Sequence, residues 1–210
     1  MAAETGESTP IYHRGSLTCP PSRMTSFDFE TLRTQIREAA RTAFAALRAQ
    51  HPNERFYAMA LYTDDGAMTV CPSANSEEAL QRILLDNDCT EPADIAYSRW
   101  GTAEWAYEHQ HAGDFTAVSD RLRAHVLKQK SGGRAFAAFR SQLHDAMVNA
   151  LADLDQEGFF GTGTDRQALT LFCSISDSDD AEAFEDDSAK RLNSPAVFAR
   201  FKARWDAPSA

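Results

Sequence analysis

Long hydrophobic runs are missing from this chain, which argues against a membrane protein. No apolar stretch approaches the ~20 residues that a helix needs to cross a bilayer. Residues 1–23 are rich in Pro, Ser, Thr and Gly and lack the continuous apolar core of a secretory signal. We therefore expect a cytoplasmic protein without a membrane segment, in which residues 1–23 form a flexible extension and residues 24–210 form a single folded domain.

Cysteines are few and widely spaced. The four of them, Cys19, Cys71, Cys89 and Cys173, form no CxxC pair and no zinc knuckle with a neighbouring histidine. Free thiols in a reducing compartment are the simplest interpretation of this spacing. Cys173 lies in an apolar segment, where burial raises the pKa of a thiol and makes its sulfur inert.

Positive charge is scarce. The chain has 21 Lys and Arg against 31 Asp and Glu, so its net charge is -10. Binding to a phosphate backbone depends on concentrated Lys and Arg, so we expect no nucleic-acid partner. An acidic surface keeps a protein soluble, and it also steers a basic partner toward it. The charge balance therefore favours a basic protein as the partner.

Familiar catalytic and cofactor motifs are also missing. The chain has no GxSxG and no HExxH. Its glycine-rich segment 158–166 leads from a helix into a strand, whereas a phosphate-binding loop leads from a strand into a helix, so we expect a turn there. His109 and His111 form an HxH pair, but no local spacing supplies a third zinc ligand. We predict no bound cofactor.

What the chain does have is the composition of one globular domain. Of its 210 residues, 43% are hydrophobic and 25% are charged, which is enough for a substantial core in one domain. Apolar residues recur at three- and four-residue steps in several segments, as on the buried side of amphipathic helices. The clearest series is Phe29, Leu32, Ile36, Ala40, Phe44 and Leu47.

Capping residues indicate where these helices begin and end. Ser26 or Asp28 precedes the first helix, in the position of a side chain that accepts a hydrogen bond from a free backbone N–H. Ser76 and Ser194 mark the starts of two later helices. Gly158 lies where a glycine that ends a helix is expected.

Segments of strand length complete the predicted fold. Residues 56–63 and 68–71 are predicted to form a hairpin around a turn at residues 64–66. Residues 95–100 have the composition of a further strand. Residues 167–176 form a near-continuous apolar run, expected to be a central strand covered on both faces. We predict an α+β domain with a mostly antiparallel sheet of about four strands covered by about six helices.

The stretch YSRWGTAEWAYEH, residues 97–109, concentrates aromatic and charged side chains. Its candidate binding residues are Arg99, Trp100, Glu104, Trp105 and Glu108. On one interpretation they line a groove, because an indole ring offers a large contact area with a polar tip. On the other, Trp100 and Trp105 fill the core, while Arg99 pairs with a glutamate, Glu104 or Glu108.

A second candidate site follows the apolar run at residues 167–176. Asp177, Asp179 and Asp180 stand at the end of the predicted strand, where a DxD pattern can hold a divalent cation through carboxylate oxygens. The same acids would also stabilise the N-terminus of a following helix, whose dipole favours negative charge. The sequence leaves both interpretations open.

The order of three segments carries a resemblance to a known family. Residues 56–80, 97–108 and 171–195 contain its most specific pieces, an RW-x3-EW-x2-E array and an ISDSD turn at residues 175–179. With these pieces the chain resembles the bacterial domain-of-unknown-function family numbered 4303, from residue 24 onward. The resemblance implies a shared fold and a bacterial origin, and it implies no activity.

We predict a noncatalytic protein-binding domain of the immunity-protein type. In this interpretation the acidic segment 177–187 steers a basic partner, and the region of Trp105 anchors it. Immunity proteins neutralise toxins whose basic surfaces complement an acidic face, and the small size and acidity of this domain fit that class.

The alternative prediction is a metal-dependent transferase or hydrolase. Asp177 and Asp179 would be the metal ligands, and Glu104 or Glu108 would be the general base. An enzyme of this kind requires the side chains to converge in a pocket, whereas a binding domain requires an exposed face. The tertiary structure distinguishes these two arrangements.

Overall fold

A computed structural model describes Met1 and residues 27–128 and 133–206, so the extension expected at residues 1–23 lies, apart from Met1, outside the described residues. The α-helices are α1 (Phe29–Gln50), α2 (Glu77–Asp86), α3 (Pro92–Trp100), α4 (Thr116–Val126), α5 (Gly133–Gln156), α6 (Gly163–Ala168), α7 (Ala181–Leu192) and α8 (Pro195–Lys202). The other elements are the 3-10 helices η1 (Thr102–Glu104) and η2 (Ala112–Phe115) and the strands β1 (Phe56–Asp64), β2 (Cys71–Ser76) and β3 (Thr170–Ser176).

The three strands form one mixed sheet in the order β2-β1-β3. The pairing of β1 with β2 is antiparallel, which confirms the predicted hairpin, and the pairing of β1 with β3 is parallel. The α+β class is confirmed. The prediction of about four mostly antiparallel strands is wrong for the described residues, because the long connection through α2 to α6 brings β3 back parallel to β1.

The second strand of the hairpin begins later than predicted. Residues 68–71 were expected to be extended, but β2 starts at Cys71. The carboxylate of Asp64 accepts hydrogen bonds from the backbone N–H of Met68 at 3.1 Å and from the hydroxyl of Thr69. These bonds hold residues 68 and 69 in the connection rather than in the ladder.

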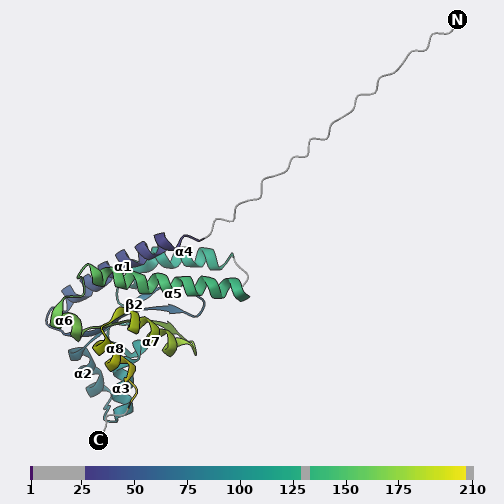
Figure 1. Cartoon of the computed structure of the whole chain (residues 1–210). Coiled ribbons are helices and arrows are strands. Elements are labelled where there is room, and N and C mark those ends of the chain that lie inside the picture. The colour runs from purple at the N-terminus through teal and green to yellow at the C-terminus, as the bar shows by residue number, and fades with distance from the viewer. Residues whose placement is uncertain (2–26, 129–132, 207–210) are drawn as a thin grey trace.

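Helices cover both faces of the sheet (Figure 1). One face packs against α1, α4 and α5, and the other packs against α2, α3, α7 and α8. Successive side chains of β1 point to opposite faces, so Met59 and Leu61 join the first core, while Ala58 and Ala60 join the second. No helix in residues 27–128 or 133–206 is long and apolar enough to cross a membrane.

Several predicted helix boundaries are confirmed. Asp28 caps α1 by accepting a hydrogen bond of 3.0 Å from the N–H of Thr31. Ser76 caps α2 and Ser194 caps α8 in the same way, each by accepting from the N–H three residues on. Gly158 follows α5 with a φ of +76°, a left-handed conformation that glycine adopts without a steric penalty.

The strand predicted at residues 95–100 is wrong, because these residues belong to α3. Pro92 occupies the start of α3, where its missing N–H and fixed φ suit a helix. The helix ends at Gly101, where a Cβ atom would lie only 2.9 Å from the carbonyl oxygen of Tyr97. The turn predicted at residues 158–166 overlaps the start of the short helix α6, and the described residues hold eight α-helices instead of about six.

The apolar run at residues 167–176 contains β3, which is buried on both faces as predicted but lies at the edge of the sheet instead of its centre. Side chains from α7 and from the residue after it form hydrogen bonds with backbone groups on the free edge of β3. The amide of Asn193 accepts from the N–H of Leu171 at 3.0 Å and donates to its carbonyl at 2.6 Å. The hydroxyl of Ser188 accepts from the N–H of Cys173 at 2.9 Å. These contacts close an edge that otherwise invites pairing with another chain.

Three of the cysteines lie in the described residues. Cys71, Cys89 and Cys173 are free thiols, and Cys19 lies outside the described residues. Burial raises the pKa of the Cys173 thiol, so this sulfur stays protonated and unreactive. Free thiols at these positions agree with the spacing of cysteines in the sequence.

Candidate functional site

The arginine of the RW-x3-EW-x2-E array pairs with a residue outside the array. Arg99 makes a two-pronged contact with the carboxylate of Glu77 on α2, with N···O distances of 2.8 to 3.1 Å. Its guanidinium also lies over the ring of Tyr57, 4.4 Å from the centroid. The expected pairing of Arg99 with Glu104 or Glu108 is therefore wrong, because α3 directs this side chain toward α2 and β1.

The two tryptophans of the array are packing residues to different degrees. Trp105 is 3% exposed, and its ring meets that of Phe172 edge to face at 5.6 Å. Trp100 is partly buried and meets the ring of Phe201 at 5.3 Å. Trp105 therefore offers no exposed ring to a partner, because the second core of the sheet encloses it.

The two glutamates of the array point to different environments. Glu104 is exposed on η1. Glu108 is partly buried and accepts a hydrogen bond from the hydroxyl of Tyr62, whose pKa is raised by burial and by this carboxylate. With Arg99 bound to Glu77 and Trp105 enclosed, the array does not line a common groove. It attaches the segment after α3 to the sheet.

The acidic turn after β3 is exposed. Asp177 adopts a φ of +55°, and both Asp177 and Asp179 project from the surface without an ion pair among the described residues. Asp180 lies 3.6 Å from the guanidinium of Arg140. Within residues 27–128 and 133–206 no group of three His, Cys, Asp or Glu side chains is arranged to hold a metal ion. These residues do not supply the third ligand that the metal-enzyme alternative requires.

The later part of the acidic segment 177–187 is neutralised within the protein. Arg204, which is 4% exposed, binds the carboxylates of Glu185 at 3.1 Å and Asp186 at 2.6 Å. Lys202 also binds Asp186, and Asp187 lies 3.7 Å from Arg191. These carboxylates hold α7 against α8 and the residues that follow it. They are not a free acidic surface.

A different acidic surface lies on α2, α3 and the loop between them. Its carboxylates are Asp86, Asp88, Glu91 and Asp94, all exposed, and none has an ion pair among the described residues. The sequence between Arg82 and Arg99 contains no Lys or Arg. These four negative charges are therefore not compensated locally.

Exposed apolar side chains accompany these carboxylates. Leu85 is 76% exposed at the end of α2, and Tyr97 is 55% exposed on α3. Glu91, Asp94 and Tyr97 follow one another at three-residue steps, which places them along one side of α3. We call Leu85, Asp86, Asp88, Glu91, Asp94 and Tyr97 the α2–α3 face.

A second exposed ring lies close to the same end of the molecule. Trp205 is 44% exposed just after α8, and α8 contacts α3 through the rings of Phe201 and Trp100. Figure 1 shows α2, α3 and α8 together in the lower part of the molecule. The arrangement combines uncompensated negative charge with large exposed rings, which suits a protein interface.

Sequence reasoning missed the α2–α3 face because it assigned residues 95–100 to a strand. A strand would have placed Tyr97 in the sheet, among the core residues. The signal that would have found the face is the run of sixteen positions from 83 to 98, which holds four acids and no base. The helix start at Pro92 would have placed Glu91, Asp94 and Tyr97 on one side.

Comparison with known proteins adds a family but no activity. Residues 36–194 match the family described as Domain of unknown function (DUF4303). No curated protein and no solved structure matches the chain. The matched range includes the whole sheet, the RW-x3-EW-x2-E array and the α2–α3 face.

Proposed function

The chain belongs to the DUF4303 family, and we propose that it is a noncatalytic protein-binding domain whose α2–α3 face binds a basic protein. The observation that carries the proposal is the coincidence of four exposed, unpaired carboxylates with the exposed side chains of Leu85 and Tyr97. Many other carboxylates of the described residues are paired with arginines, as Glu185 and Asp186 are with Arg204.

Charge complementarity supports a basic partner. Four like charges close together repel one another, and a partner's Lys and Arg side chains would relieve that repulsion while steering the encounter. A tyrosine in such a patch provides contact area at low cost in side-chain entropy. In this proposal Tyr97 takes the anchoring role that the sequence assigned to Trp105.

The partner class that fits best is a basic toxin domain, which would make the protein an immunity protein of a cell's reducing cytoplasm. A small acidic domain with free thiols suits that role. Asp177 and Asp179 form a separate exposed acidic group after β3. They provide a matched comparison for the α2–α3 face.

The test uses a photo-reactive benzoylphenylalanine placed at position 97 in cells that make the protein. We expect one main cross-linked partner with an isoelectric point above ~9, a value typical of basic binding surfaces. The double variant Asp86→Lys/Asp94→Lys should weaken binding of that partner by about tenfold or more, because each reversal replaces attraction with repulsion. The control variant Asp177→Lys/Asp179→Lys should bind as the wild type does.

Two results would contradict the proposal. One is an acidic or neutral main partner at position 97. The other is equal loss of binding in the two double variants, which would show that net charge matters and that the position of the charge does not. Because all four substituted side chains are exposed, both variants should fold as the wild type does, and circular dichroism checks this.

A further inference from the structure

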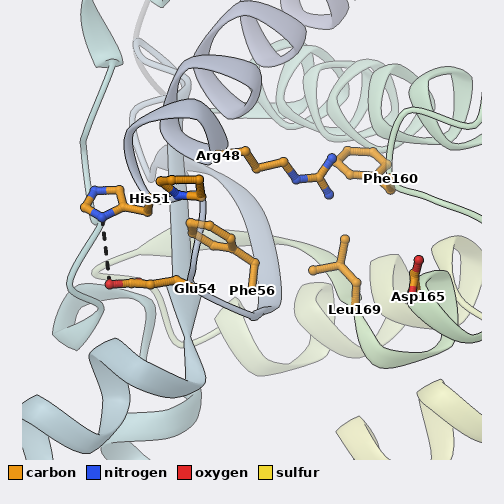
Figure 2. A pocket seen from close by; sticks show the side chains of 8 residues that line it. Arg48, His51, Glu54, Phe56, Phe160, Asp165 and Leu169 are labelled. Atoms are coloured by element: carbon orange, nitrogen blue, oxygen red, sulfur yellow. Dashed lines mark ion pairs between the residues drawn. The ribbon is translucent and has the colours of Figure 1, made fainter.

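A pocket lies where the end of α1 meets the start of β1 and the segment around α6. Its volume is about 300 Å³, at the lower end of the range for small-molecule sites. Residues that line it include Arg48, His51, Phe56, Phe160, Asp165 and Leu169. Figure 2 shows the side chain of Arg48 extending across the pocket toward the ring of Phe160.

Three apolar side chains, Phe56, Phe160 and Leu169, line the pocket beside its polar and charged residues. Phe160 and Leu169 are 2% and 3% exposed, so the hydrophobic core fixes their positions. Phe56 is partly buried and packs against the ring of Tyr107, 5.6 Å between centroids. A hydrocarbon or aromatic group in the pocket would therefore meet these three side chains, two of which the core holds in place.

The charge of Arg48 is not compensated by the described residues. Arg48 is the one partly buried arginine among them that has no carboxylate within 4 Å; the other partly buried or buried arginines are all paired. Its Nη1 donates a hydrogen bond of 2.8 Å to the carbonyl of Phe159. The guanidinium also lies 5.4 Å from the ring of Phe159 and 5.8 Å from that of Phe160.

A guanidinium has five N–H groups that can donate, and in Arg48 the Nη1 group donates to a carbonyl. Burial lowers the pKa of Arg48, yet an arginine stays charged at any physiological pH. A partly buried cation without a counter-charge is costly. An anion in the pocket would remove this cost.

The neighbouring carboxylate of Glu54 is already bound to other groups. It accepts hydrogen bonds from Ser76 and Tyr107 and forms an ion pair of 2.9 Å with Arg82. Burial raises the pKa of Glu54, but these bonds outweigh that effect and hold the pKa below its usual value. Figure 2 shows the carboxylate of Glu54 directed toward His51, away from Arg48. Glu54 therefore does not neutralise Arg48.

Asp165 limits the charge of a ligand. It is exposed at the edge of the pocket and has no ion pair among the described residues. No second Lys or Arg lines the pocket. A dianion such as phosphate would meet one cation and one unpaired carboxylate, whereas a monoanion would meet Arg48 at its charged end and the apolar wall at its other end.

We propose that this pocket binds a small monocarboxylic acid with an apolar body, whose carboxylate pairs with Arg48 and whose hydrocarbon part packs on Phe56, Phe160 and Leu169. A guanidinium matches a carboxylate in a two-pronged contact, which gives both charge and orientation. The site is separate from the α2–α3 face, so the proposal stands or falls independently of the protein-binding function.

The test is titration of the full-length protein with 3-phenylpropionate, followed by ¹H–¹⁵N NMR. We expect saturable shifts confined to amides around the pocket, including those of Phe56, Phe160 and Asp165. The uncharged amide 3-phenylpropanamide and inorganic phosphate should each bind at least about tenfold more weakly, since one lacks the charge and the other lacks the apolar body.

Variants assign the carboxylate contact. Arg48→Met should weaken binding of 3-phenylpropionate at least about tenfold, and Arg48→Lys should give an intermediate loss, because lysine keeps the charge but not the planar fork. Arg134→Met is the matched control. Arg134 is an exposed arginine without an ion pair among the described residues, at the opposite end of α5 from the pocket.

Three results would overturn the proposal. The first is the absence of pocket shifts at ~20 mM 3-phenylpropionate, a concentration about twentyfold above a dissociation constant of ~1 mM. The others are equal binding of the acid and its amide, and unchanged binding in Arg48→Lys. Because the first two comparisons use the wild-type protein, they decide the matter even where an Arg48 variant fails to fold.

Discussion

The indole N–H of Trp105 donates a hydrogen bond of 2.9 Å to the backbone carbonyl of Arg99. The same carbonyl accepts a second hydrogen bond, of 2.7 Å, from the hydroxyl of Tyr57 on β1. Two buried aromatic side chains thus donate to one carbonyl in the last turn of α3. The side chain of the same residue, Arg99, pairs with Glu77 on α2. The RW-x3-EW-x2-E array is a structural connection between α3, η1 and the sheet.

Replacement of Trp105 tests this connection. We expect Trp105→Ala to lower the free energy of unfolding by about 3–5 kcal/mol, because it empties part of the core and removes a buried hydrogen bond. Trp205→Ala, at a ring that is 44% exposed, should change it by less than about 0.5 kcal/mol. Urea unfolding of both variants is the measurement. Similar losses in the two variants would contradict the assignment of Trp105 to the core.

The partner of Arg99 can be tested with two glutamates of the same kind. Glu77→Gln should destabilise the protein by about 1 kcal/mol, because it removes the charge from a two-pronged ion pair at a partly buried site. Glu104→Gln should have almost no effect, since Glu104 is exposed on η1. Thermal unfolding at low and high salt distinguishes them. A larger effect at Glu104 would contradict this assignment and would support the pairing of Arg99 with Glu104 that the sequence suggested.

Because side chains close the edge of β3, we expect their removal to lower both the stability and the solubility of the protein. Asn193→Ala and Ser188→Ala should each destabilise the protein by about 1–3 kcal/mol, because each leaves backbone groups of β3 without a partner. The exposed edge should also promote association between chains. Chemical unfolding and light scattering measure the two effects. Asn149→Ala, at a side chain on α5 that bonds Arg191 at 3.3 Å, is the control.

Burial of His144 predicts a pH dependence of stability. Burial lowers the pKa of His144 to about 4, and its Nε2 is buried without a hydrogen-bond partner among the described residues. In the unfolded chain the pKa returns to its usual value of about 6.5. Between these values the unfolded state binds a proton that the native state does not, so the free energy of unfolding falls as pH decreases, by up to about 1.4 kcal/mol per pH unit.

Below pH 4 both states hold the proton, and this contribution stops changing. His144→Phe keeps a ring against Phe184, which the imidazole stacks on at 4.2 Å, and it should flatten the dependence between pH 6.5 and 4. Urea unfolding across this range compares it with the wild type and with His109→Gln, a variant at an exposed histidine. An unchanged slope in His144→Phe would show that other groups cause the dependence.

Helix positions could be predicted because their signals are local. Asp28, Ser76 and Ser194 each cap a helix through a side-chain oxygen that accepts a hydrogen bond from an N–H three residues on. The spacing of apolar residues at residues 29–50 indicates which side of α1 is buried. Both signals depend on residues within one or two turns of each other, so the sequence contains all that is needed.

Strand assignments failed where local composition is ambiguous. Residues 95–100 are apolar and aromatic enough for a strand, but the helix start at Pro92 outweighs that composition. The run that contains β3 was placed at the centre of the sheet because both of its faces are buried. Burial of both faces also occurs at an edge when a helix such as α7 packs beside the strand and supplies Ser188 and Asn193 to its free groups.

The sequence by itself determined the α+β class, most helices, the hairpin and the family, because periodicity, capping and turn residues act over short distances along the chain. Only the tertiary structure decided which charges are compensated. Arg99 meets Glu77 across 22 positions, Arg204 meets Glu185 across 19, and Arg48 meets no carboxylate of the described residues. Ion pairs and pockets depend on distances in space between separate elements, and no pattern along the chain specifies those distances.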